Sequence, residues 1–170
     1  MKMDAGIRPL DAGDDLDAIT AIIRAAYARL SNMGLRYWAT FQSVDDTRQR
    51  FADGYGLVAI RDTVIVGTLT VYPPNDASDV EVYRDPTTYN IGQFAVDPQW
   101  QGAGIGRLLH DAAIDYIRSN GGTRIALDTS DQAHHLIGMY ERWGYHIVGH
   151  ADWRPLTNYE SVVMVKDVED

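Results

Sequence analysis

Apolar residues recur along this chain with two periods, one typical of helices and the other typical of strands. Between residues 15 and 30 they fall at the three- and four-residue spacing of an amphipathic helix, and this spacing returns at 105–120 and 135–143. A further short helix is expected at 45–51. Apolar and β-branched runs predict strands at 7–10, 57–60, 64–71, 89–96, 124–128, 145–151 and 159–166. This order of helices and strands predicts an α/β protein.

The connections indicate how these strands pair. Residues 61–63 form a short turn, so the runs on either side of it are expected to form a hairpin. The strand that ends at Val96 and the strand that ends at Asp128 are joined by the helix from Ile105, which predicts a parallel pair. The chain has 170 residues, no repeats and no low-complexity linker, so we expect residues 1–170 to form one domain.

A glycine-rich turn lies between the strand at 89–96 and the helix that follows, with the sequence Gln101-Gly102-Ala103-Gly104-Ile105-Gly106. Glycine allows unusual backbone angles and lets a ligand come close. The first amides of a helix lack partners within it and lie at its electropositive end, so this turn is suited to hold a diphosphate. A P-loop is excluded because Arg107 and Leu108 follow Gly106 in place of Lys and Ser or Thr. The dinucleotide fingerprint fails because Arg107 stands where it needs a glycine.

The pattern that remains is Gln/Arg-x-x-Gly-x-Gly/Ala, matched by Gln101, Gly104 and Gly106. It resembles the acyl-CoA loop of the GCN5-related N-acetyltransferases, the GNAT superfamily. Residues 94–101 are similar to that family's fourth strand, and residues 139–145 to its Tyr-Glu-x-x-Gly-Phe/Tyr helix segment. The resemblance covers about residues 89–166. One position departs from it: Ala133 stands where the family often has Asn, with residues 130–132 as substitutes for that cofactor contact.

The resemblance implies both a fold and a cofactor site. The fold would be the single-domain GNAT fold, of the α/β (α+β) class. It has a mixed, mostly antiparallel twisted sheet of about seven strands, a central parallel pair that splays apart, and flanking helices. The acyl donor would be acetyl-CoA, with its pantetheine arm between the splayed strands, against the main chain of Phe94 and Val96. Its diphosphate would lie on the amides of Gln101, Gly102, Ala103, Gly104, Ile105, Gly106 and Arg107.

Tyr140 is the residue expected to carry the chemistry. Protonation favours departure of the CoA thiolate, and a phenol stays protonated at neutral pH because its free pKa is about 10. In the family, the matching tyrosine bonds the thioester sulfur, which makes Tyr140 the implied general acid. On spacing alone it is also typical of a core residue, since it shares one helix face with Leu136 and Trp143.

The general base and the acceptor site stay open. Three carboxylates are expected to bind the acceptor amine: Glu81, Asp128 and Glu160. These three, His134, His135, water and the carbonyls near Gln93 are all candidates for the base. Acidic residues also gather between Pro74 and Pro86, either as a solvated loop or as a fence that collects an amine. Residues 153–161 are either a plain connection or part of the acceptor pocket.

Composition narrows the expected partners. A net charge of −9 disfavours nucleic acid and favours cationic partners. No apolar run approaches the roughly 20 residues that span a bilayer, and residues 1–6 show no signal-peptide core, so we expect a cytoplasmic protein without membrane contact. The lack of cysteine excludes disulfides and an acyl-cysteine relay. No metal site is expected, because His146 and His150 lie in a strand.

These observations together predict a GNAT-type N-acetyltransferase that uses acetyl-CoA and no metal. It would move the acetyl group to a primary amine of a small cationic acceptor, aminoglycoside- or polyamine-like, by direct transfer in a ternary complex. Two alternatives stay open, a protein or peptide amine as acceptor and a non-catalytic acyl-CoA sensor, and the presence of Tyr140 favours an enzyme. Because many relatives pair through C-terminal strands, a homodimer is also expected.

Overall fold

The computed structural model describes residues 5–169. Its centre is a seven-stranded sheet with the order β1-β2-β3-β4-β5-β7-β6. The strands are β1 (Gly6–Pro9), β2 (Tyr55–Arg61), β3 (Val64–Tyr72), β4 (Thr88–Val96), β5 (Arg124–Ser130), β6 (His146–Asp152) and β7 (Glu160–Asp167). All neighbours are antiparallel except β4 and β5, which confirms the predicted mixed sheet. Residues 1–4, on which the expectation about a signal peptide mostly rests, lie outside the described residues.

Within residues 5–169, five helices and three single turns of 3-10 helix connect these strands. The helices are α1 (Leu16–Ala26), α2 (Ala28–Asn32), α3 (Val44–Ala52), α4 (Ile105–Ser119) and α5 (His134–Arg142). The 3-10 turns are η1 (Trp38–Thr40), η2 (Glu81–Arg84) and η3 (Pro98–Trp100). The helix expected at 15–30 is in fact two helices that meet at Tyr27, whose side chain bonds the carbonyl of Phe94. Within the described part of the chain, no helix is both long and apolar enough to cross a membrane.

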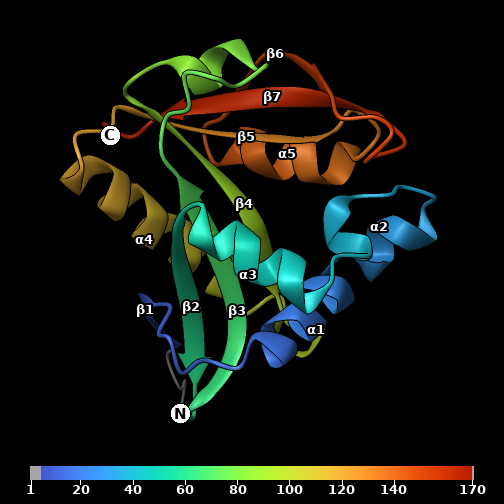
Figure 1. Ribbon diagram of the computed structural model, residues 1–170, viewed down its shortest axis with the longest axis vertical. Coiled ribbons are helices and arrows are strands. Elements are labelled where there is room, and N and C mark those ends of the chain that lie inside the picture. The colour runs from blue at the N-terminus through green and yellow to red at the C-terminus, as the bar shows by residue number, and fades with distance from the viewer. Residues whose placement is uncertain (1–4, 170) are drawn as a thin grey trace.

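The central parallel pair separates along its length. Strands β4 and β5 are paired only from Thr88 and Arg124 to Asn90 and Ala126. Farther along, β4 carries a bulge, because Thr68 of β3 faces Ala95 while Thr70 faces Gly92. Gln93 in this bulge has a φ of 48°, which is uncommon for a residue with a side chain. In Figure 1, β2, β3 and β4 run down the view whereas β5 and β7 cross its top, so the sheet opens beyond the bulge.

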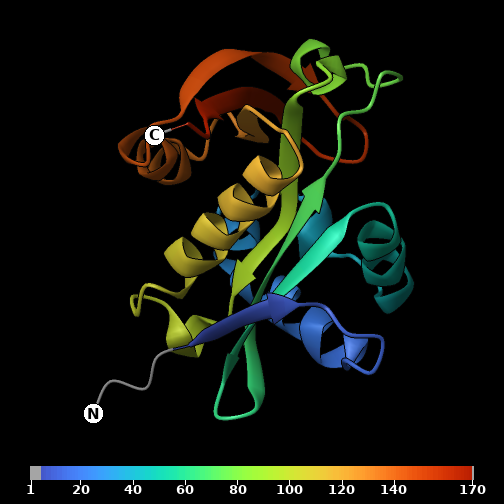
Figure 2. The same ribbon diagram turned by 90° about the vertical axis from the view of Figure 1, so that its left-hand side faces the viewer.

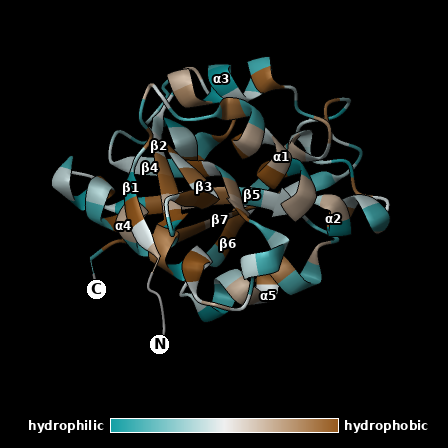
Figure 3. Ribbon diagram, turned by 90° about the horizontal axis from the view of Figure 1, so that it is seen from below, coloured by the Kyte–Doolittle hydropathy of each residue, from teal (hydrophilic) through white to brown (hydrophobic). Residues whose placement is uncertain are grey.

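Helices cover both faces of the sheet. Side chains alternate along β2, so Leu57 and Ala59 face α4 while Val58 faces α1. Figures 1 and 2 show α4 on one face and α1 and α3 on the other. Figure 3 shows the brown, hydrophobic strands at the centre of the molecule and teal, hydrophilic positions on the outer helices. The apolar contacts between these helices and the two faces of the sheet hold the opened sheet in place.

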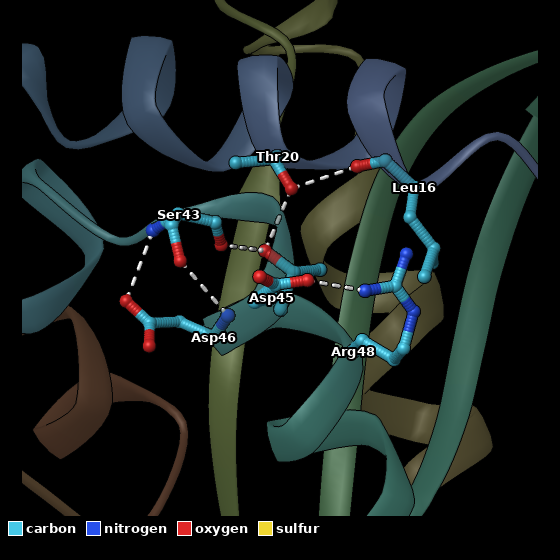
Figure 4. A network of polar contacts seen from close by, with 7 residues as sticks. Leu16, Thr20, Ser43, Asp45, Asp46 and Arg48 are labelled. Atoms are coloured by element: carbon cyan, nitrogen blue, oxygen red, sulfur yellow. Dashed lines mark hydrogen bonds and ion pairs between the residues drawn. The ribbon is translucent and has the colours of Figure 1, made fainter.

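A chain of polar groups fixes α3 against α1 and the bulge, and Figure 4 shows its part between α1 and α3. Ser43 begins α3 with a capping box, in which its hydroxyl accepts from the amide of Asp46 and the Asp46 carboxylate accepts from the amide of Ser43. The hydroxyls of Thr20 on α1 and Thr47 on α3 lie 2.7 Å apart. The buried side-chain amide of Gln42 continues this chain to Thr47 and to Gln93, at 2.7 and 2.8 Å. As a result, α3 is held at a defined distance from β4.

Candidate active site

Tyr140 lies on α5 where two cavities meet. Its ring is buried and packs edge-on against Trp143 and Tyr145, with centroids 5.7 and 5.5 Å apart. Tyr140 lines both cavities, together with Tyr27, Phe94 and Leu136. Burial raises the pKa of Tyr140 well above its usual value, and the neighbouring tyrosines add to this effect. The phenol therefore keeps its proton at neutral pH.

The smaller cavity is a groove of about 340 Å³ that runs from the N-terminus of α4 to Tyr140. Of the nine residues predicted to hold the cofactor, all but Ala103 line it: Phe94, Val96, Gln101, Gly102, Gly104, Ile105, Gly106 and Arg107. Ala103 is exposed in the turn between Gly102 and Gly104. The side-chain amide of Gln101 donates to the carbonyl of Val96 at 3.2 Å and ties the turn to β4.

The groove fits the diphosphate end of a CoA thioester. Gly102 and Gly104 both have a φ of 82°, in the left-handed region, and a Cβ added to either would meet no atom within 4 Å. The amides of residues 102–107 donate no hydrogen bond to any other described residue. They lie at the positive end of a 15-residue helix, which suits them to bind phosphate oxygens. The Arg107 guanidinium lies over the Trp143 ring at 5.0 Å, at the side of the same groove.

The larger cavity, of about 790 Å³, has aromatic walls and is here called the acceptor cavity. Its aromatic residues come from every layer of the fold: Tyr27, Tyr37, Trp38, Tyr72, Tyr83, Phe94, Tyr140, Trp153 and Tyr159. The segment 153–161 does more than connect β6 to β7. It lines this cavity through Trp153, Leu156, Thr157 and Tyr159. Two ligands bound in the two cavities would therefore meet beside Tyr140.

Asp128 is the one predicted acceptor-binding carboxylate that lines the acceptor cavity. It stands in the half of β5 that has separated from β4. One carboxylate oxygen accepts from the hydroxyl of Tyr83 at 2.6 Å, and the other accepts from Nε1 of Trp153 at 3.1 Å. Burial raises the pKa of Asp128, although these two donors and the charge of Arg50 oppose the shift. Asp128 forms no ion pair with any residue between 5 and 169.

The structure places the other two predicted carboxylates elsewhere. Glu81 is exposed in η2, and Glu160 is exposed at the start of β7, 3.3 Å from Arg154. Neither lines either cavity, nor do His134 and His135. The acidic loop around Glu81 does contribute Pro74, Asn75, Ser78 and Tyr83 to the acceptor cavity, but not its acidic residues Asp76, Asp79 and Asp85. An acceptor contact at Glu81 or Glu160 stays a prediction.

Sequence reasoning missed the part of the acceptor cavity that comes from the first half of the chain. Arg50 lies on α3, Trp38 in η1, and Tyr27 between α1 and α2. No local motif distinguishes them, because a helix arginine or a lone aromatic is common in any sequence. Only the packing of α1 and α3 over the bulged β4 brings them together. Among the described residues, no group of three or more His, Asp or Glu side chains is placed to hold a metal ion.

The opened sheet, the glycine turn before α4 and the groove that ends at a buried tyrosine define an acyl-CoA-dependent acyltransferase architecture. The chain belongs to the acetyltransferase (GNAT) family, whose model matches residues 20–145. This confirms the predicted family and fold class.

Individual proteins are similar to this chain in sequence or in fold. Over 150 residues the chain is 31% identical to the mycothiol acetyltransferase of Propionibacterium freudenreichii subsp. shermanii, covering 84% of this chain and 45% of that protein. The chain thus spans about half the length of this curated relative. Its structure is similar to that of PH1933 from Pyrococcus horikoshii OT3, with a TM-score of 0.74, 21% identity and coverage of 96% and 98% of the two chains. An aminoglycoside 6'-acetyltransferase type Ii has a TM-score of 0.71 at 18% identity, over 97% of this chain and 98% of that one.

Proposed function

We propose that this protein transfers the acetyl group of acetyl-CoA directly to a primary amine of a small cationic acceptor. The observation that carries the proposal is the position of Tyr140, which lines both the cofactor groove and the acceptor cavity. A molecule that only senses acyl-CoA needs the groove, but it needs neither a second cavity nor a proton donor at the junction. The lack of cysteine leaves no acyl-cysteine relay, so both substrates would be bound together.

The acyl donor supplies a thioester, whose carbonyl carbon forms the new C–N bond and whose C–S bond breaks. Tyr140 would hold a proton on its hydroxyl for the leaving sulfur, since burial keeps the pKa of this phenol high. The amides of 102–107 would fix the diphosphate and so place the thioester beside Tyr140. Holding the two reactants in line supplies much of the rate in such transfers.

Asp128 would bind the incoming amine as its ammonium ion. Its carboxylate faces the acceptor cavity, and Tyr83 and Trp153 hold its orientation. The burial that raises its pKa also makes it a stronger base, so it would accept the proton that the ammonium must lose before attack. The aromatic walls add favourable faces for a cation.

The experiment that tests this function measures thiol release from acetyl-CoA with a panel of aminoglycosides, polyamines, amino acids and basic peptides. Because the chain has no cysteine, a thiol-reactive dye reports CoA alone. Turnover with one class of small amine supports the proposal, whereas turnover with peptides alone would favour a protein acceptor. Tight CoA binding without turnover on any amine would overturn it in favour of a sensor. The 31% identical relative makes a mycothiol-type acceptor a second candidate. Because such an acceptor carries its own thiol, its acetylation would be followed by chromatography of the product instead of the dye.

A further inference from the structure

Two charged side chains line the acceptor cavity besides Asp128, namely Arg50 and Asp53. Arg50 of α3 lines this cavity, half-buried, and no carboxylate within residues 5–169 forms an ion pair with it. Asp46 lies on the same helix, and Asp53 directly follows its last residue. Asp46 is engaged by the amide of Ser43 and by Nε1 of Trp38, and Asp53 is exposed and accepts from Gln49. The guanidinium of Arg50 is therefore available to an anionic group of a ligand in the cavity.

Two contacts hold the Arg50 guanidinium in place. Its Nη1 donates to Oε1 of Gln42 at 2.9 Å, and its plane lies over the Trp38 ring at 4.5 Å. Gln42 is itself fully buried and bonded to Thr47 and Gln93. An arginine positioned in this way has lost most of its side-chain freedom before a ligand arrives, which favours binding.

A second donor stands beside the guanidinium. The hydroxyl of Tyr72, at the end of β3, lines the same cavity and is buried. Arg50 and Thr70 lie near it, but it makes no hydrogen bond of good geometry with any described residue. The two groups are close to one another, because a Cβ added at Gly92 would lie 3.2 Å from Nη2 of Arg50 and 3.8 Å from the Tyr72 hydroxyl. A buried hydroxyl without a partner is costly, so a ligand oxygen at this point would satisfy it.

We propose that Arg50 and Tyr72 bind a carboxylate of the acceptor, so that the preferred substrate is an amine that also carries an acid group. A planar guanidinium fork matches a carboxylate better than it matches a hydroxyl or a second amine. The inference rests on the proposed function and narrows its small cationic acceptors to those of basic amino-acid type. In such a molecule, the carboxylate occupies the Arg50 end and the ammonium lies toward Asp128 and Tyr140.

Matched pairs of substrates test this directly. L-lysine differs from 1,5-diaminopentane, and L-ornithine from 1,4-diaminobutane, by the carboxylate alone. We expect kcat/KM of the wild-type protein to be at least about tenfold higher for the acid of each pair, from one charge-assisted contact. Arg50→Gln should lower kcat/KM for the acids by about 10- to 100-fold and leave the diamines within about twofold. Tyr72→Phe should shift the same ratio in the same direction by a smaller factor.

The matched control is Arg48→Gln on the same helix, an exposed residue that pairs with Asp45 outside the cavity. It should leave both members of each pair unchanged. Equal losses for acids and diamines in Arg50→Gln, or a wild-type preference for the diamines, would overturn the carboxylate site while the transferase function stands. If no amine in the panel releases CoA thiol, the proposed function itself fails, so the two failures are distinguishable.

Discussion

The hydroxyl of Tyr27 donates a hydrogen bond to the main-chain carbonyl of Phe94 over 3.0 Å, across 67 residues of sequence. Tyr27 is the residue where α1 gives way to α2, and Phe94 follows the bulge residue Gln93 on β4. Both residues line the groove and the acceptor cavity. Burial raises the pKa of Tyr27 to about 12, so its hydroxyl stays a donor over the whole neutral range. This bond joins the helical layer to the strand at the junction of the two cavities.

Tyr27→Phe should test the importance of that bond. Removing the donor leaves a part-buried carbonyl without its partner, so the free energy of unfolding should fall by about 1 kcal/mol, and kcat/KM should fall with it. Urea unfolding and thiol-release kinetics measure the two effects. Tyr55→Phe is the control, because Tyr55 stacks on Tyr116 away from both cavities and its hydroxyl is not part of the junction. Equal losses in both variants would show that the Tyr27 bond has no special role.

Tyr140→Phe should lower kcat by about 10²- to 10⁴-fold, the usual contribution of a general acid. The dissociation constant of CoA should stay the same, because the amides proposed to bind its phosphates lie at the other end of the groove. Steady-state kinetics and calorimetric titration with CoA separate the two quantities. Tyr145→Phe removes a neighbouring hydroxyl that bonds His110 and lines neither cavity, so it should cost stability but leave kcat unchanged. An active Tyr140→Phe variant would contradict the assigned role.

The glycine turn predicts opposite stability effects for two similar substitutions. Gly104→Ala places a side chain at a φ of 82° and should destabilise the protein by about 1–2 kcal/mol. Gly106 lies within α4, and a Cβ there would make an ordinary 3.6 Å contact with Phe94, so Gly106→Ala should raise stability by up to about 1 kcal/mol. Both should weaken CoA binding, since both residues line the groove. Urea unfolding with and without CoA measures both effects. If the two substitutions changed the free energy of unfolding in the same direction, this account would be refuted.

His110 should make the stability of the protein depend on pH. It is fully buried on α4, bonded through Nε2 to the Tyr145 hydroxyl, and burial lowers its pKa from 6.5 to about 4, with smaller effects from Arg107 and Lys166. Because the unfolded chain binds the proton first, this contribution is complete above pH 6.5 and is lost as the pH falls toward 4. The full difference corresponds to about 3 kcal/mol.

Urea unfolding between pH 4 and 8 measures this dependence. His110→Gln should flatten the rise of unfolding free energy between pH 4 and 6.5. His134→Gln, which replaces an exposed histidine at the start of α5, should leave the rise as it is. A wild-type protein without this rise would show that folding does not lower the pKa of His110.

The cofactor half of the site could be predicted from the sequence because its determinants are local. A strand, a glycine turn and a helix start are adjacent along the chain, and the proposed contacts to the cofactor come from backbone amides. Gly102 and Gly104 therefore indicate the groove that the structure shows there. Tyr140 was predicted from a local feature too, because its helix segment 139–145 resembles the family's Tyr-Glu-x-x-Gly-Phe/Tyr segment; its catalytic role stays a prediction. The strands were predicted to within about two residues because apolar alternation is itself a local property.

The acceptor half was decided only by the tertiary structure. Glu81, Asp128 and Glu160 could not be told apart by sequence, and only Asp128 stands where β5 has separated from β4. Arg50, Tyr72 and Tyr27 lie far from both motifs, and they meet in one cavity because the bulge at Gln93 opens the sheet and a buried polar chain fixes α3 over it. A binding site made of backbone amides that are close together in the sequence can be inferred from the order of the residues. Side chains that converge from distant elements depend on packing, which residue order alone does not specify.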